Sequence, residues 1–169
     1  ETPVMTPQST FMIVAVIRKG RIDDLRALLA TMNRAPGHAD PDNTLMPFGL
    51  FDRLHVARFV IIEAHTADEI EAYGLPPSEW RPALAFLGDC DGDAKSFIDE
   101  LARHAEQGLR KIFSLCEGFS EDSRNLTQWM QARSIKPAAN YINWIGRTVR
   151  QVREEAALHQ SLSACLQDI

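Results

Sequence analysis

The chain has 169 residues, of which 45% are hydrophobic and 24% are charged. These proportions are typical of a compact globular domain and exclude a disordered or fibrous chain. The 18 basic and 23 acidic residues give a net charge of -5, which argues against a nucleic-acid partner, because proteins that bind phosphates generally carry excess positive charge.

The longest apolar runs have the length of a strand, whereas a membrane-spanning helix needs about 18 apolar residues, so we expect no membrane segment. Cys90, Cys116 and Cys165 are widely spaced and form no CxxC pair. Neither a zinc knuckle nor a thioredoxin-like redox pair is therefore expected. The simplest interpretation is a reduced, cytoplasmic chain.

The first third of the chain predicts a strand, a helix and a loop. Residues 1–10 are polar, contain two prolines and predict a flexible lead-in. The apolar, β-branched run at 11–18 predicts a buried strand. Apolar residues recur at helical spacing over 22–32. Prolines and Gly37 at 34–49 predict a long loop.

The remaining segments complete an α+β order. We expect strands at 51–63, 82–89 and 138–145, and helices at 97–115, 126–133 and 148–166. The first six elements match the ferredoxin-like βαββαβ arrangement, an antiparallel sheet with helices on one face, followed here by an additional helix. We therefore predict an α+β domain at 11–145 and a C-terminal amphipathic helix at 146–169.

The predicted topology makes the second and third strands antiparallel neighbours, so the start of one lies beside the end of the other. His55 then lies near Asp89 and Asp91, while Arg58 faces the other side of the sheet. His55 is a candidate general base, haem ligand or metal ligand, or alternatively a half-buried histidine with one hydrogen bond. Arg58 predicts either an ion pair or an anion-binding group.

Three carboxylates alternate along the end of the third strand, at Asp89, Asp91 and Asp93. Carboxylate oxygens suit divalent cations such as Mg²⁺, and this pattern makes the three residues candidate metal ligands. No Gly-rich phosphate loop accompanies them. The alternative is a turn in which the carboxylates accept main-chain hydrogen bonds and cap the next helix.

The segments Leu54-His55-Val56-Ala57-Arg58-Phe59-Val60-Ile61-Ile62 and Leu84-Ala85-Phe86-Leu87-Gly88-Asp89-Cys90-Asp91-Gly92-Asp93, with the element order, resemble the dimeric α/β-barrel branch of ferredoxin-like folds. Members pair two sheets into a barrel-like dimer and have a pocket between sheet and helices. The branch includes small monooxygenases and haem-handling proteins such as dye-decolourising peroxidases and chlorite dismutases. The resemblance covers residues 11–145 at the level of fold pattern. The peroxidases' distal GxxDG motif is not matched here, and His159 is the candidate for the proximal histidine that they carry on a later helix.

The resemblance implies our leading hypothesis, a homodimeric domain that binds a small molecule, with haem as one candidate. If the chain is an enzyme, oxidoreductase chemistry is the first expectation, with His55, Arg58, Asp89 and Asp91 as catalytic residues. Whether it is an enzyme stays open, and so does the cofactor, for which haem and a divalent cation are the candidates.

Two alternatives belong to other functional classes. The first is a non-catalytic dimerisation or protein-interaction module of a longer protein, because the last helix carries an apolar seam beside Arg147, Arg150 and Arg153. The second is a Mg²⁺-dependent phosphoryl-transfer domain that uses the Asp89 and Asp91 pair.

Overall fold

The computed structural model describes residues 6–63, 81–120, 125–140 and 146–167. A three-stranded antiparallel sheet has the order β1-β5-β4, with strands β1 (Gln8–Val16), β4 (Leu54–Ile62) and β5 (Ala83–Asp91). A small hairpin pairs β2 (Asn33–Ala35) with β3 (His38–Ala39). The helices are α1 (Ile22–Ala30), α3 (Ala94–His104), α4 (Glu106–Phe113), α5 (Leu126–Gln131) and α6 (Val149–Gln167), with the 3₁₀ turn η1 (Phe48–Leu50).

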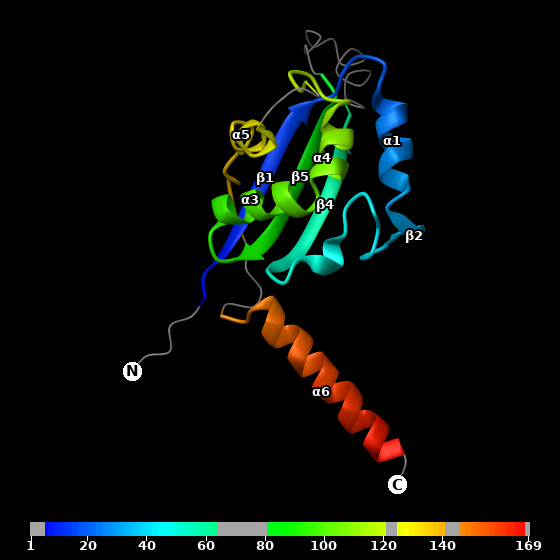
Figure 1. The fold of residues 1–169 in the computed structure, drawn as a ribbon, viewed down its shortest axis with the longest axis vertical. Helices are drawn as coiled ribbons and strands as arrows, with labels where there is room; N and C mark the ends of the chain where they lie inside the picture. The colour runs from blue at the N-terminus through cyan, green and yellow to red at the C-terminus, as the bar shows by residue number, and fades with distance from the viewer. Residues whose placement is uncertain (1–5, 64–80, 121–124, 141–145, 168–169) are drawn as a thin grey trace, which may run out of the picture.

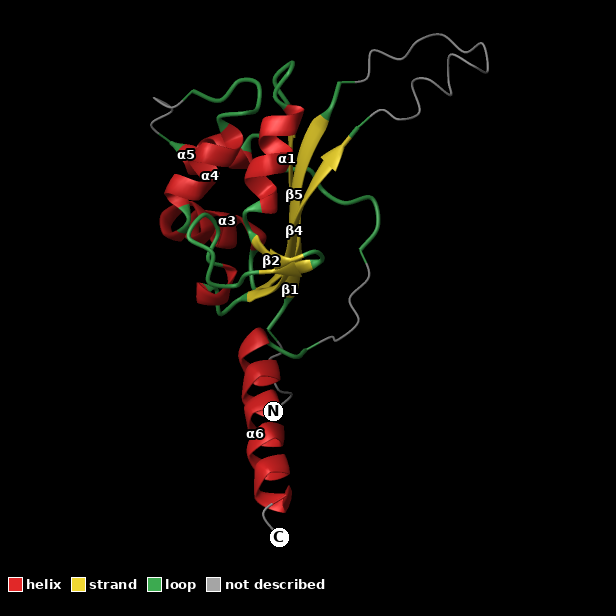
Figure 2. Cartoon of the chain, turned by 90° about the vertical axis from the view of Figure 1, so that its right-hand side faces the viewer, coloured by secondary structure: helices red, strands yellow, loops and turns green. Residues whose placement is uncertain are grey.

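The sheet and helices form two layers. Figure 2 shows α1, α3, α4 and α5 on one side of the sheet, while α6 extends away beyond the end of the sheet. Figure 1 shows α3 and α4 crossing in front of the sheet. Strand alternation turns Phe11, Ile13 and Phe86 towards these helices, where all three are buried. The Phe11 ring lies 5.2 Å from Phe86 and 5.6 Å from Phe97 of α3, so aromatic packing joins the two layers.

The opposite side of the sheet, the open sheet face, carries no described helix. Its cross-strand rows are Thr10–Asp89–Val56, Met12–Leu87–Arg58, Val14–Ala85–Val60 and Val16–Ala83–Ile62. Val56 and Val60 are 41% and 38% exposed, although both lie in the middle of a strand. Among the described residues, no covering layer lies on this mostly apolar sheet face.

The expected α+β class with an antiparallel sheet is confirmed, and several boundaries differ. β1 begins at Gln8, so three residues of the expected lead-in belong to the sheet. The expected loop at 34–49 contains most of the β2–β3 hairpin and the turn η1. The expected single helix at 97–115 is divided at Ala105, whose φ of -122° and ψ of 26° are not helical. Alanine favours helices, so the sequence carries no signal for this break.

The structure does not confirm the finer βαββαβ topology. Of the fourth strand expected at 138–145, residues 141–145 lie outside the described residues and 138–140 are in no strand. A different segment contacts the free edge of β1: Ser134 forms an isolated antiparallel bridge with Ile13, and the Ile135 N–H donates to Met12 O at 2.8 Å. This single bridge is too short to count as a strand.

Across the described ranges, every helix is either too short or too polar to cross a lipid bilayer.

Gly108 gives a stability prediction. It lies buried in α4, where a Cβ would overlap the main-chain oxygen of Leu45. We expect Gly108→Ala to lower the free energy of unfolding by about 1–3 kcal/mol through steric strain, although alanine favours the helix. Urea denaturation measures this, with the exposed neighbour Gln107→Ala as control. A stabilised Gly108→Ala variant would show that α4 and Leu45 are not packed closely.

Candidate functional site

A polar cluster lies at the end of β5, around the carboxylate of Asp91. Asp91 is only 6% exposed. Its Oδ1 lies 2.8 Å from His55 Nε2, and its Oδ2 accepts a 2.8 Å hydrogen bond from the main-chain N–H of Val149. The antiparallel pairing of β4 with β5 produces the first contact, aided by an irregularity in the register between Leu54 and Val56. The second contact joins residues 58 positions apart.

The histidine in this cluster has a defined hydrogen-bonding role. His55 Nε2 lies within reach of both Asp91 and the amide of Gln8, whose Nε2 is 3.0 Å away. One ring nitrogen cannot donate to the carboxylate and accept from the amide at once. The carboxylate is the stronger acceptor, so the Nε2–H of His55 donates to Asp91. The Gln8 amide instead donates to Arg147 O at 2.9 Å.

These contacts attach α6 to the end of the sheet. Asp91 accepts from the Val149 N–H at the start of α6, and the Gln8 amide donates to Arg147 O just before it. Arg153 on the helix pairs with Asp52 at 2.8 Å. A carboxylate is favourable at a helix N-terminus, where unpaired N–H groups carry partial positive charge. The His55–Asp91 pair is therefore an anchor for α6, and both oxygens of Asp91 are engaged.

The other expected site residues lie apart from this anchor. Asp89 Oδ1 accepts a 2.6 Å hydrogen bond from Thr10 Oγ1. Asp93 caps α3 by accepting from the Ser96 N–H at 2.8 Å. Arg58 is exposed on the open sheet face and has no hydrogen bond or ion pair with another described residue. Only His55 and Asp91 are brought together.

The three aspartates do not converge as metal ligands. Within the described ranges, no group of three His, Cys, Asp or Glu side chains could hold a metal ion. Asp93 is directed to the first turn of α3, while Asp91 is directed to His55 and α6. The geometry therefore gives no support to a divalent cation at this strand end.

Arg53 is a structural residue that the sequence analysis missed. Its Nε donates to Asp91 O at 2.8 Å, its Nη1 reaches Glu100 at 3.2 Å and its Nη2 reaches Asp93 O at 3.2 Å. It thus holds the turn between β5 and α3 against the start of β4. An arginine before a strand belongs to no motif, so only the three-dimensional arrangement reveals it.

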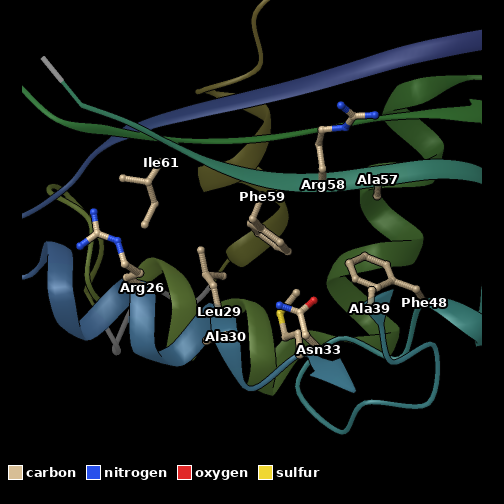
Figure 3. Close-up of a pocket in the computed structure, with 11 residues that line it drawn as sticks. Arg26, Leu29, Ala30, Asn33, Ala39, Phe48, Ala57, Arg58, Phe59 and Ile61 are labelled. Carbon is tan, nitrogen blue, oxygen red and sulfur yellow. The ribbon is translucent and has the colours of Figure 1, made fainter. Parts of the chain in front are cut away.

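A cavity of about 440 Å³ opens between α1 and β4. Figure 3 shows Leu29 and Ala30 of α1 on one side, with Phe59 and Ile61 of β4 directed towards them, while the Arg58 side chain points away. The lining residues are Arg26, Leu29, Ala30, Met32, Asn33, Ala39, Phe48, Ala57, Arg58, Phe59 and Ile61. The Phe59 ring stacks on Phe86 with centroids 4.2 Å apart, so this wall rests on the buried core.

The positive charge that lines the pocket is neutralised by acidic neighbours. Its Arg26 guanidinium is paired with Asp23 and with Glu63, each at 2.7 Å. The Arg58 side chain points away, so Asn33 is the remaining polar side chain at the pocket. The other lining residues are apolar. The pocket is therefore suited to an apolar molecule with few polar groups.

The pocket does not fit haem. Haem iron is usually held by His, Cys or Tyr, with Met as a further axial ligand, and the lining includes only Met32 from that set. Of the candidate histidines, His55 is engaged by Asp91, and His159 lies on the exposed surface of α6.

Comparisons with family models, curated proteins and solved structures give no match for this chain.

We expect Asp91→Asn to lower the free energy of unfolding by about 1–3 kcal/mol, because either the half-buried donor of His55 or the buried N–H of Val149 loses its acceptor. Far-UV circular dichroism should also show lost helix as α6 loses its cap. Asp93→Asn is the matched control, since asparagine caps helices as well as aspartate. Equal stability of the two variants would show that the anchor contributes nothing.

Burial raises the pKa of the Cys90 and Cys116 thiols from 9.0 to about 12 in each case. In Cys165→Ser protein we expect neither thiol to react with Ellman's reagent at pH 8, and both to react in guanidinium chloride. The unfolded thiols ionise first, so the free energy of unfolding should fall as pH rises from about 9 towards 12. Rapid labelling of the native variant would contradict the burial of both residues.

Proposed function

We propose that this domain binds a small, largely apolar and uncharged organic molecule in the pocket between α1 and β4. The observation that carries the proposal is the pocket itself: about 440 Å³, within the roughly 300–1,000 Å³ typical of ligand sites, with apolar walls on both sides. Ala30, Ala39 and Ala57 line it, and their small side chains leave the space open. The Asn33 amide supplies a hydrogen-bonding group that can orient the ligand.

The proposal is for binding rather than catalysis. The lining contains no His, Cys, Asp, Glu or Lys, the groups that usually transfer protons or attack a substrate. His55 and Asp91 hold α6, and Asp89 is paired with Thr10, so these expected catalytic residues have structural partners. The binding function does not need any of them.

We also propose that the domain has the ferredoxin-like topology expected from the sequence, and the strand order supports this. A βαββαβ chain places its third strand between the first and second, and here β5 lies between β1 and β4. One helix, α1, connects β1 to the hairpin region before β4. A pocket between sheet and helices also agrees with the resemblance to dimeric α/β-barrel proteins.

A competing cavity of about 450 Å³ lies beside the start of α3. Its lining combines the charged side chains of Asp93, Lys95 and Lys136 with apolar ones such as Ile98 and Ile135. We favour the pocket between α1 and β4 because the one charged side chain that faces it, Arg26, is neutralised by ion pairs and because one wall rests on the buried Phe86.

We expect Ala57→Leu to fill the pocket and to weaken binding of 5-fluoroindole, a neutral aromatic probe, by roughly tenfold or more. Fluorine NMR linewidths report the binding. Val56→Leu is the matched control, because Val56 is the adjacent residue on the opposite sheet face. Equal binding by Ala57→Leu and wild type, or no saturable binding to either, would remove this proposal.

A second candidate function is association with another protein chain, in accordance with the interaction-module hypothesis. It is favoured by α6, on which Leu158, Leu162 and Leu166 are 60%, 56% and 72% exposed. Beyond its anchored start, nearly every described residue of this 19-residue helix is exposed, whereas most helical stability in proteins comes from packing of an apolar face. Burial of these leucines against a partner would supply the missing packing.

A further inference from the structure

Two apolar surfaces of this chain have no partner within the described residues. One is the open sheet face. The other is a row of side chains at four-residue spacing on α6, which we name the α6 ridge; it consists of Arg150, Glu154, Leu158, Leu162 and Leu166. Residues at this spacing lie one above the other along a helix. All five are exposed.

The anchor at the end of β5 keeps α6 away from its own sheet face. The Val149 N–H is held by Asp91, and Arg153 is held by Asp52 and by Phe51 O. With both ends of the first turn fixed, α6 points away beyond the sheet, as both views show (Figures 1 and 2). To lie on its own open sheet face, the helix would have to reverse direction and lose these contacts.

The two surfaces match in length. α6 has 19 residues, which span about 28 Å at 1.5 Å per residue. Strands β1, β4 and β5 each have nine residues, which span about 30 Å at 3.3 Å per residue. One helix therefore covers the full length of one sheet face.

The two surfaces also match in the order of their charges. Counted from the anchored end, the open sheet face presents the acid Asp89, then the base Arg58 one row further, then only apolar rows. The α6 ridge presents the base Arg150, then the acid Glu154, then three leucines. Adjacent rows on one face are two strand residues, about 6.6 Å, apart. Successive ridge residues are about 6 Å apart.

We propose that two copies of this chain form a symmetric dimer in which α6 of each copy lies along the open sheet face of the other. A two-fold axis near the anchor brings the start of each α6 to the anchored end of the partner's sheet. In this register Arg150 lies near the partner's Asp89, and Glu154 lies near the partner's Arg58. Leu158 and Leu162 then cover the partner's two apolar rows, and Leu166 reaches the far end of its sheet.

This exchange of α6 helices between the two copies gives the exposed Arg58 an acidic partner. Glu154 is now paired with Arg150 at 2.8 Å on the helix surface, where an ion pair contributes little, so changing partners costs little. The inference rests on the second candidate function, association, and does not depend on the ligand pocket, which lies on the other side of β4. The occupant of the open sheet face is thus a second copy of the chain.

Native Cys165 provides the test, because it is exposed and flanks the far end of the α6 ridge. The register places it near Ile62 of the partner, in the last cross-strand row, and far from Val56 in the first. We expect mild oxidation of Ile62→Cys to give a covalent dimer joined between the introduced thiol and Cys165, identified by peptide mass spectrometry. Val56→Cys, on the same strand and face, should give no bond to Cys165.

Each other result contradicts the exchange. An Ile62→Cys dimer that persists in the Cys165→Ser background would show that two sheets face each other directly, so association would stand while the exchange would fail. A disulfide within one chain would show α6 on its own sheet. A Cys165–Cys165 dimer of the wild type would show helix pairing instead. A monomeric mass by light scattering, with no disulfide formed, would overturn association as well.

Discussion

The buried carboxylate of Asp91 determines how the last helix relates to the rest of the molecule. It lies where three parts of the chain meet: the end of β5, the start of β4 through His55, and the start of α6 through Val149. A carboxyl group in such a buried place requires hydrogen-bond partners for its oxygens, and the helix N-terminus and the imidazole provide them. The direction of α6, and with it the exposure of its leucines, follows from this one group.

The sheet has two faces with different roles. The helix-facing side holds the aromatic core and, next to the edge strand β4, leaves a pocket walled by alanines and by Phe59. The opposite side is mostly apolar, and no helix of the described part of the chain covers it. Binding of a small molecule and association with a second chain can therefore proceed on opposite sides of β4, without competing for the same residues.

Several of these features were predictable from sequence because they depend on local pattern and on strand pairing. Alternation and helical spacing predict the three strands of the main sheet and most helices, although not the β2–β3 hairpin, and the antiparallel neighbour relation brings His55 to Asp91. The contact of Asp91 with Val149 was not predictable, since nothing local relates residues 58 positions apart. Neither the helix break at Ala105 nor the hydrogen bonds from Arg53 to the turn between β5 and α3 have a signal in the sequence. The pocket depends on where α1 lies over β4, which periodicity does not determine.

Arg58 has one more physical consequence, which concerns solubility. In the described part of the chain, β4 pairs only with β5, so its outer edge presents unpaired main-chain groups. Its sequence, LHVARFVII, is rich in β-branched and aromatic residues and free of proline and glycine, the composition that recruits further strands. A charge at the middle of such a strand opposes stacking with identical copies. Arg58 thus protects the edge of the sheet against uncontrolled growth into fibrils.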